Sequence, residues 1–172
     1  MLSKILLKLI KESIIPALLV VTAKFAGIVL TVTILSIPWT ISTQSLFPTI
    51  TFSSMSNFVT VSSWSNFFVL AAVSLGFLWI LIKAHFLHDT HITPQLTLQL
   101  LDLDLTNLID TTPNISNQGI IWLSYLWVLI ILTGVQAFFG YHYWWMFALS
   151  LFVGAILTWS FIADLEREVE WA

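Results

Sequence analysis

The sequence of 172 residues contains no cysteine, which excludes disulfides, thiolate nucleophiles, iron–sulfur clusters and cysteine-ligated zinc. Charged residues are also scarce. They make up 9% of the chain, whereas soluble domains average about 25%. The net charge of −3 lacks the basic excess typical of nucleic-acid binding, so it argues against a nucleic-acid partner. Hydrophobic residues make up 58% of the chain, and a soluble protein of this composition would expose large apolar patches.

Two long stretches of the chain, residues 25–82 and 111–163, contain no Asp, Glu, Lys or Arg. A transmembrane helix needs about 20 mostly apolar residues, so each stretch fits two membrane crossings joined by a turn. We predict crossings at residues 14–37, 67–84, 120–139 and 143–163. Because each isolated span in lipid must satisfy its own backbone hydrogen bonds, helix is the expected state. The predicted fold is therefore an all-α integral membrane protein, with four transmembrane helices bundled in a single domain over residues 1–172.

Basic residues flank these crossings on one side only. They are Lys4, Lys8, Lys11, Lys83 and Arg167. The segments on the other side, residues 38–66 and 140–142, contain no Lys or Arg. Since basic residues accumulate on the cytoplasmic face, we expect both termini to be cytoplasmic. The expected location is the cytoplasmic (inner) membrane of a bacterium, and the lipid bilayer is an expected partner.

The predicted outer loop, residues 38–66, is rich in Ser and Thr, and its apolar residues alternate loosely with hydroxyls. It fits either a small hairpin or a segment lying on the outer surface, and its periodicity does not choose between them.

The predicted inner connection contains an amphipathic helix over residues 94–110. Thr93 and Pro94 form a typical helix start, with a capping residue followed by proline at the first helical position. Polar residues then recur every three or four positions, and leucines fill most of the remaining circumference. Such a helix would lie at the cytoplasmic membrane interface. A strand is the alternative, but the alternation slips between Leu100 and Leu101, which a continuous strand would not tolerate.

A cluster of possible metal ligands, His85, His88, Asp89 and His91, follows the second predicted crossing. If the helix continued through them, His85 and Asp89 would lie one turn apart, which is the spacing of paired helical metal ligands. Imidazole with carboxylate suits zinc or iron. A surface role at headgroup depth is the favoured interpretation, because the chain has a single such cluster. His142 is expected on the opposite side, about 30 Å away.

Lys24 is the one ionisable residue well inside a predicted crossing. A cation at this depth is costly unless it is paired, hydrated or extended toward the interface. Extension to the inner interface is the favoured interpretation. The functional alternative is a polar cavity that binds an anion or a lipid headgroup, with Gln136, Thr22, Ser124 and Tyr125 as candidate neighbours.

Small residues recur every four positions on three of the predicted helices, which predicts close helix packing within the chain or between chains. The repeats are Ala23, Gly27 and Thr31 on the first helix, Ala72 and Gly76 on the second, and Ser150, Gly154 and Thr158 on the fourth.

The sequence contains no Gly-rich phosphate loop, no Ser/His/Asp arrangement and no paired intramembrane carboxylates, so we expect no catalytic residues and no cofactor. The favoured function is a non-catalytic accessory, scaffold or assembly subunit, present as a homo-oligomer or within a larger membrane complex. One alternative is a membrane-surface metal-binding enzyme that uses the His85 cluster. The other is an oligomeric channel or lipid-binding transporter that involves Lys24.

Overall fold

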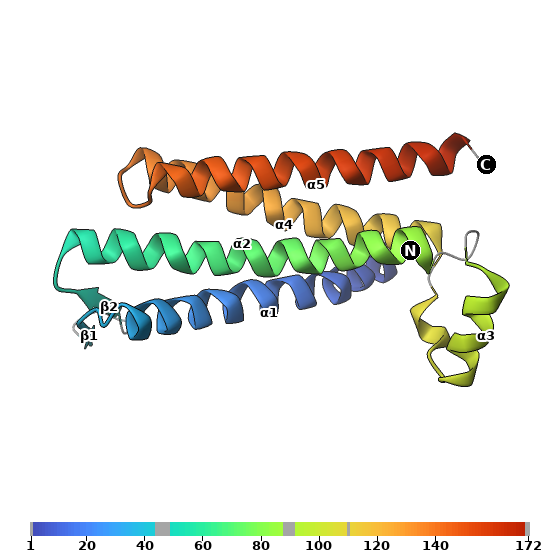
Figure 1. The fold of residues 1–172 in the computed structure, drawn as a ribbon, viewed down its shortest axis with the longest axis horizontal. Helices are drawn as coiled ribbons and strands as arrows, with labels where there is room; N and C mark the ends of the chain where they lie inside the picture. Colours follow the sequence, from blue (N-terminus) through green and yellow to red (C-terminus); the bar gives the residue numbers. More distant parts are fainter. Residues whose placement is uncertain (1, 44–48, 88–91, 110, 171–172) are drawn as a thin grey trace.

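The computed structural model of the protein describes residues 2–43, 49–87, 92–109 and 111–170 (Figure 1). In chain order the elements are α1 (Leu2–Ile34), β1 (Trp39–Ser42), β2 (Thr49–Phe52), α2 (Met55–Phe86), α3 (Pro94–Asp102), the 3-10 turn η1 (Thr106–Leu108), α4 (Thr112–Phe138) and α5 (Trp144–Glu170). Four of these helices, α1, α2, α4 and α5, are long and apolar enough to cross a membrane. The prediction of a mostly helical protein with four helices able to span a membrane is confirmed.

The four long helices lie alongside one another (Figure 1). At one end of the bundle, called here the hairpin end, lie β1, β2 and the turn between α4 and α5. At the other end, called the terminal end, lie α3 and both chain termini. α2 packs against α1, α4 and α5, and α4 also contacts α1 and α5. The α2–α4 pair therefore forms the centre of the bundle.

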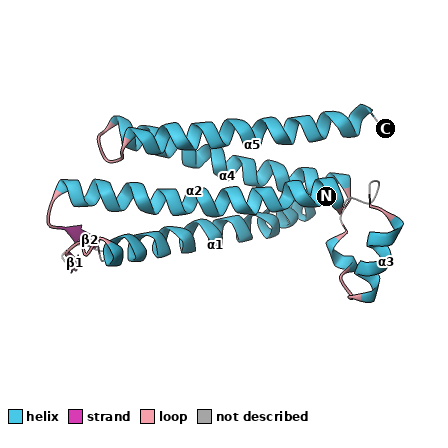
Figure 2. Cartoon of the chain, in the orientation of Figure 1, coloured by secondary structure: helices cyan, strands magenta, loops and turns pink. Residues whose placement is uncertain are grey.

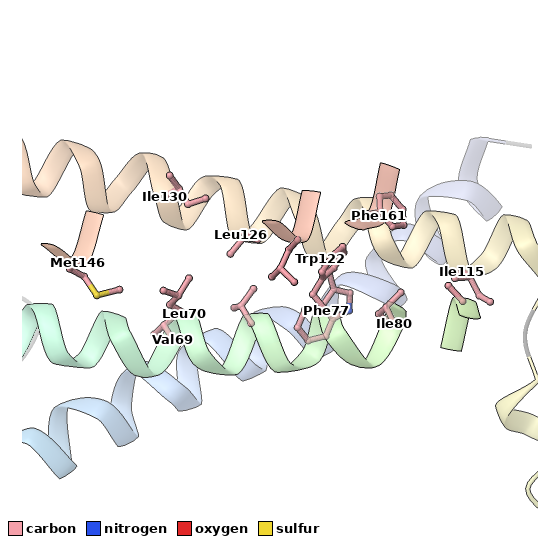
Figure 3. Packing of buried hydrophobic residues seen from close by; sticks show 13 residues of the cluster. Val69, Leu70, Phe77, Ile80, Ile115, Trp122, Leu126, Ile130, Met146 and Phe161 are labelled. Carbon is pink, nitrogen blue, oxygen red and sulfur yellow. The ribbon is translucent and has the colours of Figure 1, made fainter. Parts of the chain in front are cut away.

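The core between these helices is apolar and closely packed (Figure 3). Phe77, Leu126 and Met146 bring α2, α4 and α5 together and are fully buried. Trp122 of α4 packs against α2 where Gly76 has no side chain, since a Cβ atom there would meet the indole ring at 2.1 Å. The predicted small residues of the second helix thus accommodate a large aromatic ring from a neighbouring helix.

The small residues predicted on the first helix face α2. A Cβ atom on Gly27 would lie 2.8 Å from the Cα atom of Ser65, so the two backbones are in direct contact at this point. Thr31 is buried one turn further on and donates its hydroxyl to the Gly27 carbonyl at 2.6 Å. This close approach brings the last third of α1 against the first half of α2, where Ser62, Ser65 and Asn66 lie.

α2 begins at Met55, well before residue 67, where the sequence predicted the second crossing to start. Ser54 caps it by accepting the Asn57 backbone N–H at 3.2 Å. The predicted outer loop is therefore divided. Its first part is the antiparallel hairpin of β1 and β2, whose strands are short (Figure 2), and its Ser-rich second part is helical.

α3 ends at Asp102, so the predicted helix of residues 94–110 is divided as well. The Leu105 N–H donates to the Leu100 carbonyl at 2.8 Å, and the Asp104 N–H donates to the Leu101 carbonyl at 3.2 Å. This pair of hydrogen bonds is a Schellman motif, with Asp104 in the left-handed conformation at φ 55°. η1 follows it. Asp tolerates this conformation better than most residues, which is why the chain can turn here without glycine.

Candidate functional site around Lys24

Lys24 lies within the apolar span of α1, Leu9–Ile34, and its side chain crosses to α2. The Nζ atom donates hydrogen bonds to Ser65 Oγ at 2.8 Å and to Asn66 Oδ1 at 2.5 Å. The ammonium is therefore held between two helices inside the bundle, and its side chain does not extend along α1 to the terminal end. An ammonium group has three N–H donors, and these two contacts use two of them.

Asn66 connects Lys24 to the rest of the hairpin end. Its Oδ1 atom accepts from the ammonium, so its amide nitrogen faces the other way. That nitrogen donates to His142 Nε2 at 3.1 Å and lies 3.4 Å from Gln136 Oε1 on α4. All three polar contacts of the Asn66 amide are thus inside the protein, and its side chain is buried. The cation fixes the orientation of the amide.

His142 lies in the turn between α4 and α5 and is buried, with 3% of its surface exposed. Its Nε2 atom accepts from the Asn66 amide, which can only donate, and Ser62 Oγ lies 3.1 Å from the same nitrogen. We therefore assign the ring proton to Nδ1, which donates to Ser63 Oγ at 3.1 Å. The Tyr143 backbone N–H donates to the same hydroxyl oxygen at 3.0 Å. These contacts require a neutral imidazole in one tautomer.

The electrostatics of the turn favour the same neutral state. His142 lies outside the two apolar spans that it connects, Pro113–Phe138 and Trp144–Glu166. Burial, followed by the positive charge of Lys24, lowers the pKa of His142 from its usual 6.5 to about 4. At neutral pH the imidazole is therefore uncharged, and the positive charge of this cluster belongs to Lys24.

No carboxylate is available from the chain to balance that charge. The sequence has no Asp or Glu in residues 13–88 or 111–163, and these ranges include β1, β2, the α4–α5 turn, all of α2 and α4, and most of α1 and α5. Glu12 lies twelve residues before Lys24 on α1, about 18 Å away along the helix axis. The hairpin end therefore contains a partly buried cation whose partners within the chain are neutral oxygens.

A cavity of about 190 Å³ opens beside the Lys24 ammonium. Its polar lining consists of Lys24, Ser62 and Ser65. The remaining walls are apolar, and they include Ile28 of α1, Ile50 and Phe52 of β2, and Phe58 of α2. The site thus combines one cation with a mostly apolar, open-sided pocket between α1, α2 and the hairpin.

A second cavity of about 190 Å³ lies between α1 and the hairpin. It shares Ile28 and Ile50 with the first, and its walls are almost wholly apolar, with Phe25, Trp39 and Ile41 among them. The two cavities therefore adjoin one another under the same strand.

The structure describes one of the four predicted metal ligands. His85 is exposed near the end of α2, and its ring packs edge-on against Phe86 with 4.6 Å between the ring centroids. His88, Asp89 and His91 lie outside the described residues. Within the described ranges no group of three or more His, Asp or Glu side chains is placed to hold a metal ion. Metal binding at this cluster stays a prediction.

Of the neighbours predicted for Lys24, Gln136 belongs to the network, through Asn66. Thr22 and Ser124 instead donate to carbonyls of their own helices, and the Tyr125 hydroxyl donates to the Ser13 carbonyl. The direct partners, Ser65 and Asn66, were not identified because residues 38–66 were expected to form a loop. One signal could have identified them. Ser62, Ser65 and Asn66 follow the spacing i, i+3, i+4, which places polar groups on one face of a helix.

Comparison with known proteins gives no assignment, since the chain matches no protein-family model, no curated protein and no solved structure.

Proposed function

We propose that this chain is a small polytopic membrane protein without catalytic chemistry of its own, which binds an anionic ligand at Lys24. In this role it would act as an accessory or assembly subunit of a membrane complex. The observation that carries the proposal is the Lys24 ammonium, held by Ser65 and Asn66 beside a cavity in a half of the protein that contains no carboxylate.

The physical reason is the energy of a charge inside a membrane. A lysine at the centre of a span is costly by several kcal/mol unless a partner offsets the loss of water. Ser65 and Asn66 supply dipoles but no negative charge, and an ammonium has one further N–H to donate. Lys24 lines the cavity, so an anion that entered it would reach the ammonium and complete its coordination. This supports the ligand-binding alternative over a lysine that merely extends to the interface.

We also propose that both termini and α3 lie on the cytoplasmic side, so that the cavity belongs to the outer half of the membrane. The support is the distribution of basic residues, which flank the terminal end of the bundle and are missing from the hairpin and the α4–α5 turn. Because the chain has no cysteine, single cysteines report the orientation directly. Ser54→Cys should react with a membrane-impermeant reagent added outside, and Thr97→Cys should react only after the membrane is opened.

The binding proposal is tested by mass spectrometry of the protein purified in mild detergent. We expect the wild type to retain about one anionic molecule per chain and Lys24→Met to lose it. Lys83→Met is the matched control, because it removes a lysine at the terminal end and should leave the bound molecule in place. Equal retention by the wild type and Lys24→Met would contradict the proposal.

A second variant leaves the amine in place. Asn66→Asp puts a carboxylate where Lys24 now meets a neutral oxygen, so the protein supplies the counter-ion itself. We expect this variant to exclude the anionic molecule while remaining folded. Retention of the molecule by Asn66→Asp would show that charge does not hold it.

A further inference from the structure

We infer that the ligand at Lys24 is a single-chain fatty acid, with its carboxylate at the ammonium and its hydrocarbon chain beneath the β1–β2 hairpin. This inference rests on the proposed anion-binding function and adds the chemical class of the ligand.

The polar part of the site fits a small head with one negative charge. The Ser65 hydroxyl accepts from Lys24 and donates to the Ser62 carbonyl at 2.9 Å, so its donor is already used. The Ser62 hydroxyl lies at hydrogen-bond distance from His142 Nε2. One ammonium N–H then remains for the ligand. A phosphate monoester would bring three charged or polar oxygens into apolar walls, where unsatisfied polar groups are costly, whereas a carboxylate brings two.

The apolar part of the site is larger than such a head needs. A cavity of about 15 Å³ is enough for one water molecule, and each of the two adjoining cavities measures about 190 Å³. Their shared residues, Ile28 and Ile50, mark the route from the ammonium into the second cavity. A hydrocarbon chain attached to the carboxylate would follow this route and meet apolar side chains along its whole length.

The β1–β2 hairpin presents an apolar face to the two cavities. Trp39 pairs with Phe52 across the two strands, and Ile41 pairs with Ile50, so all four side chains lie on one face. Each of the four lines one or both cavities. The intervening threonines lie on the opposite face, where the hydroxyls of Thr40 and Thr51 are 2.8 Å apart.

Packing within the protein leaves these apolar side chains partly uncovered. Trp39 is 49% exposed, Ile41 58% and Ile50 39%, although the hairpin presents them to α1. A hydrocarbon chain in the two cavities would cover them. An inorganic anion would leave them uncovered.

The test uses the full-length protein in lipid nanodiscs, with 9,10-dibromostearate as the probe, because bromine quenches tryptophan fluorescence at short range. Trp39 lines the second cavity, so the wild type should show saturable quenching and Trp39→Phe should lose most of it. Stearate should displace the probe. Methyl stearate, which has the chain without the charge, and acetate, which has the charge without the chain, should each compete at least tenfold more weakly. Lys24→Met and Asn66→Asp should each weaken binding at least tenfold, while Lys83→Met should not.

The possible failures are distinguishable. If acetate or inorganic phosphate competed as strongly as stearate, the result would support an anion site at Lys24 but refute the fatty-acid inference. If dodecyl phosphate displaced the probe more strongly than stearate, the carboxylate assignment would be wrong. If methyl stearate competed equally, or if Lys24→Met bound stearate like the wild type while folded, the inference and the proposed function would both be refuted.

Discussion

Replacement of Asn66 by leucine tests whether the buried network holds Lys24 in place. Leucine has a similar size but removes the acceptor of the ammonium and the donor to His142 and Gln136. A hydrogen bond to a charged group contributes about 1.5–3 kcal/mol net. Each neutral hydrogen bond within a membrane protein contributes about 0.6 kcal/mol. We therefore expect Asn66→Leu to lower the free energy of unfolding by about 3 kcal/mol.

The assay is reversible unfolding in mixed micelles of mild detergent and sodium dodecyl sulfate. Asn57→Leu is the matched control, because Asn57 lies on the same helix and its amide donates to Ser53 alone, at 3.0 Å. It should lower the free energy of unfolding by less than about 1 kcal/mol. In the double variant Lys24→Met/Asn66→Leu, the loss of unfolding free energy should be smaller than the sum of the losses in the two single variants, because no ammonium is left without its acceptor. Equal losses in Asn66→Leu and Asn57→Leu, or strict additivity, would refute the network.

Three further predictions concern the packing, the turn and the end of α1. Gly27→Ala should lower the free energy of unfolding by about 1–3 kcal/mol, because the new Cβ atom would meet the α2 backbone. Gly154→Ala is the control, since its Cβ atom would meet only the flexible tip of Ile130, and its stability should stay within about 1 kcal/mol of the wild type. Equal effects of the two substitutions would contradict this prediction. Burial lowers the pKa of His142 from 6.5 in the unfolded chain to about 4 in the folded turn, so unfolding titrations should show stability falling by about 1–3 kcal/mol as the pH drops between these values. His142→Asn should lack this slope, and a wild type without it would refute the assignment. Ser36→Gly should raise the unfolding free energy by about 1 kcal/mol, because Ser36 has φ 50° at the end of α1; a destabilised variant would contradict this.

The sequence predicted the four spanning helices well, because charge and hydropathy alone decide which segments can enter lipid. It also singled out Lys24 as the anomalous residue. It did not predict where α2 begins. Residues 55–66 carry many hydroxyls, so they resemble a polar loop, yet they are helical because Ser54 caps them and their polar face meets His142 and Lys24. Tertiary contacts of this kind are not visible in local composition.

The same limit explains the partners of Lys24. Ser65 and Asn66 are about forty residues away in the sequence, and His142 lies further on, in the turn between α4 and α5. Their meeting depends on the register of α1 against α2, which is set by the close approach at Gly27. The small-residue repeat indicated that α1 would pack closely against something. It did not indicate which helix, or at which height. The early end of α3 at Asp102 was missed for a local reason, since the left-handed residue that stops it is an aspartate rather than a glycine.

The account depends most on a direct contact between the Lys24 ammonium and a ligand carboxylate. Solid-state NMR can measure this contact as a dipolar coupling between 15N-labelled lysine side chains and stearate labelled with 13C at the carboxyl carbon. We predict a coupling that corresponds to an ion pair, with nitrogen and oxygen within about 4 Å, and its loss in Lys24→Met. No measurable coupling at saturating stearate, or an unchanged coupling in Lys24→Met, would contradict the account.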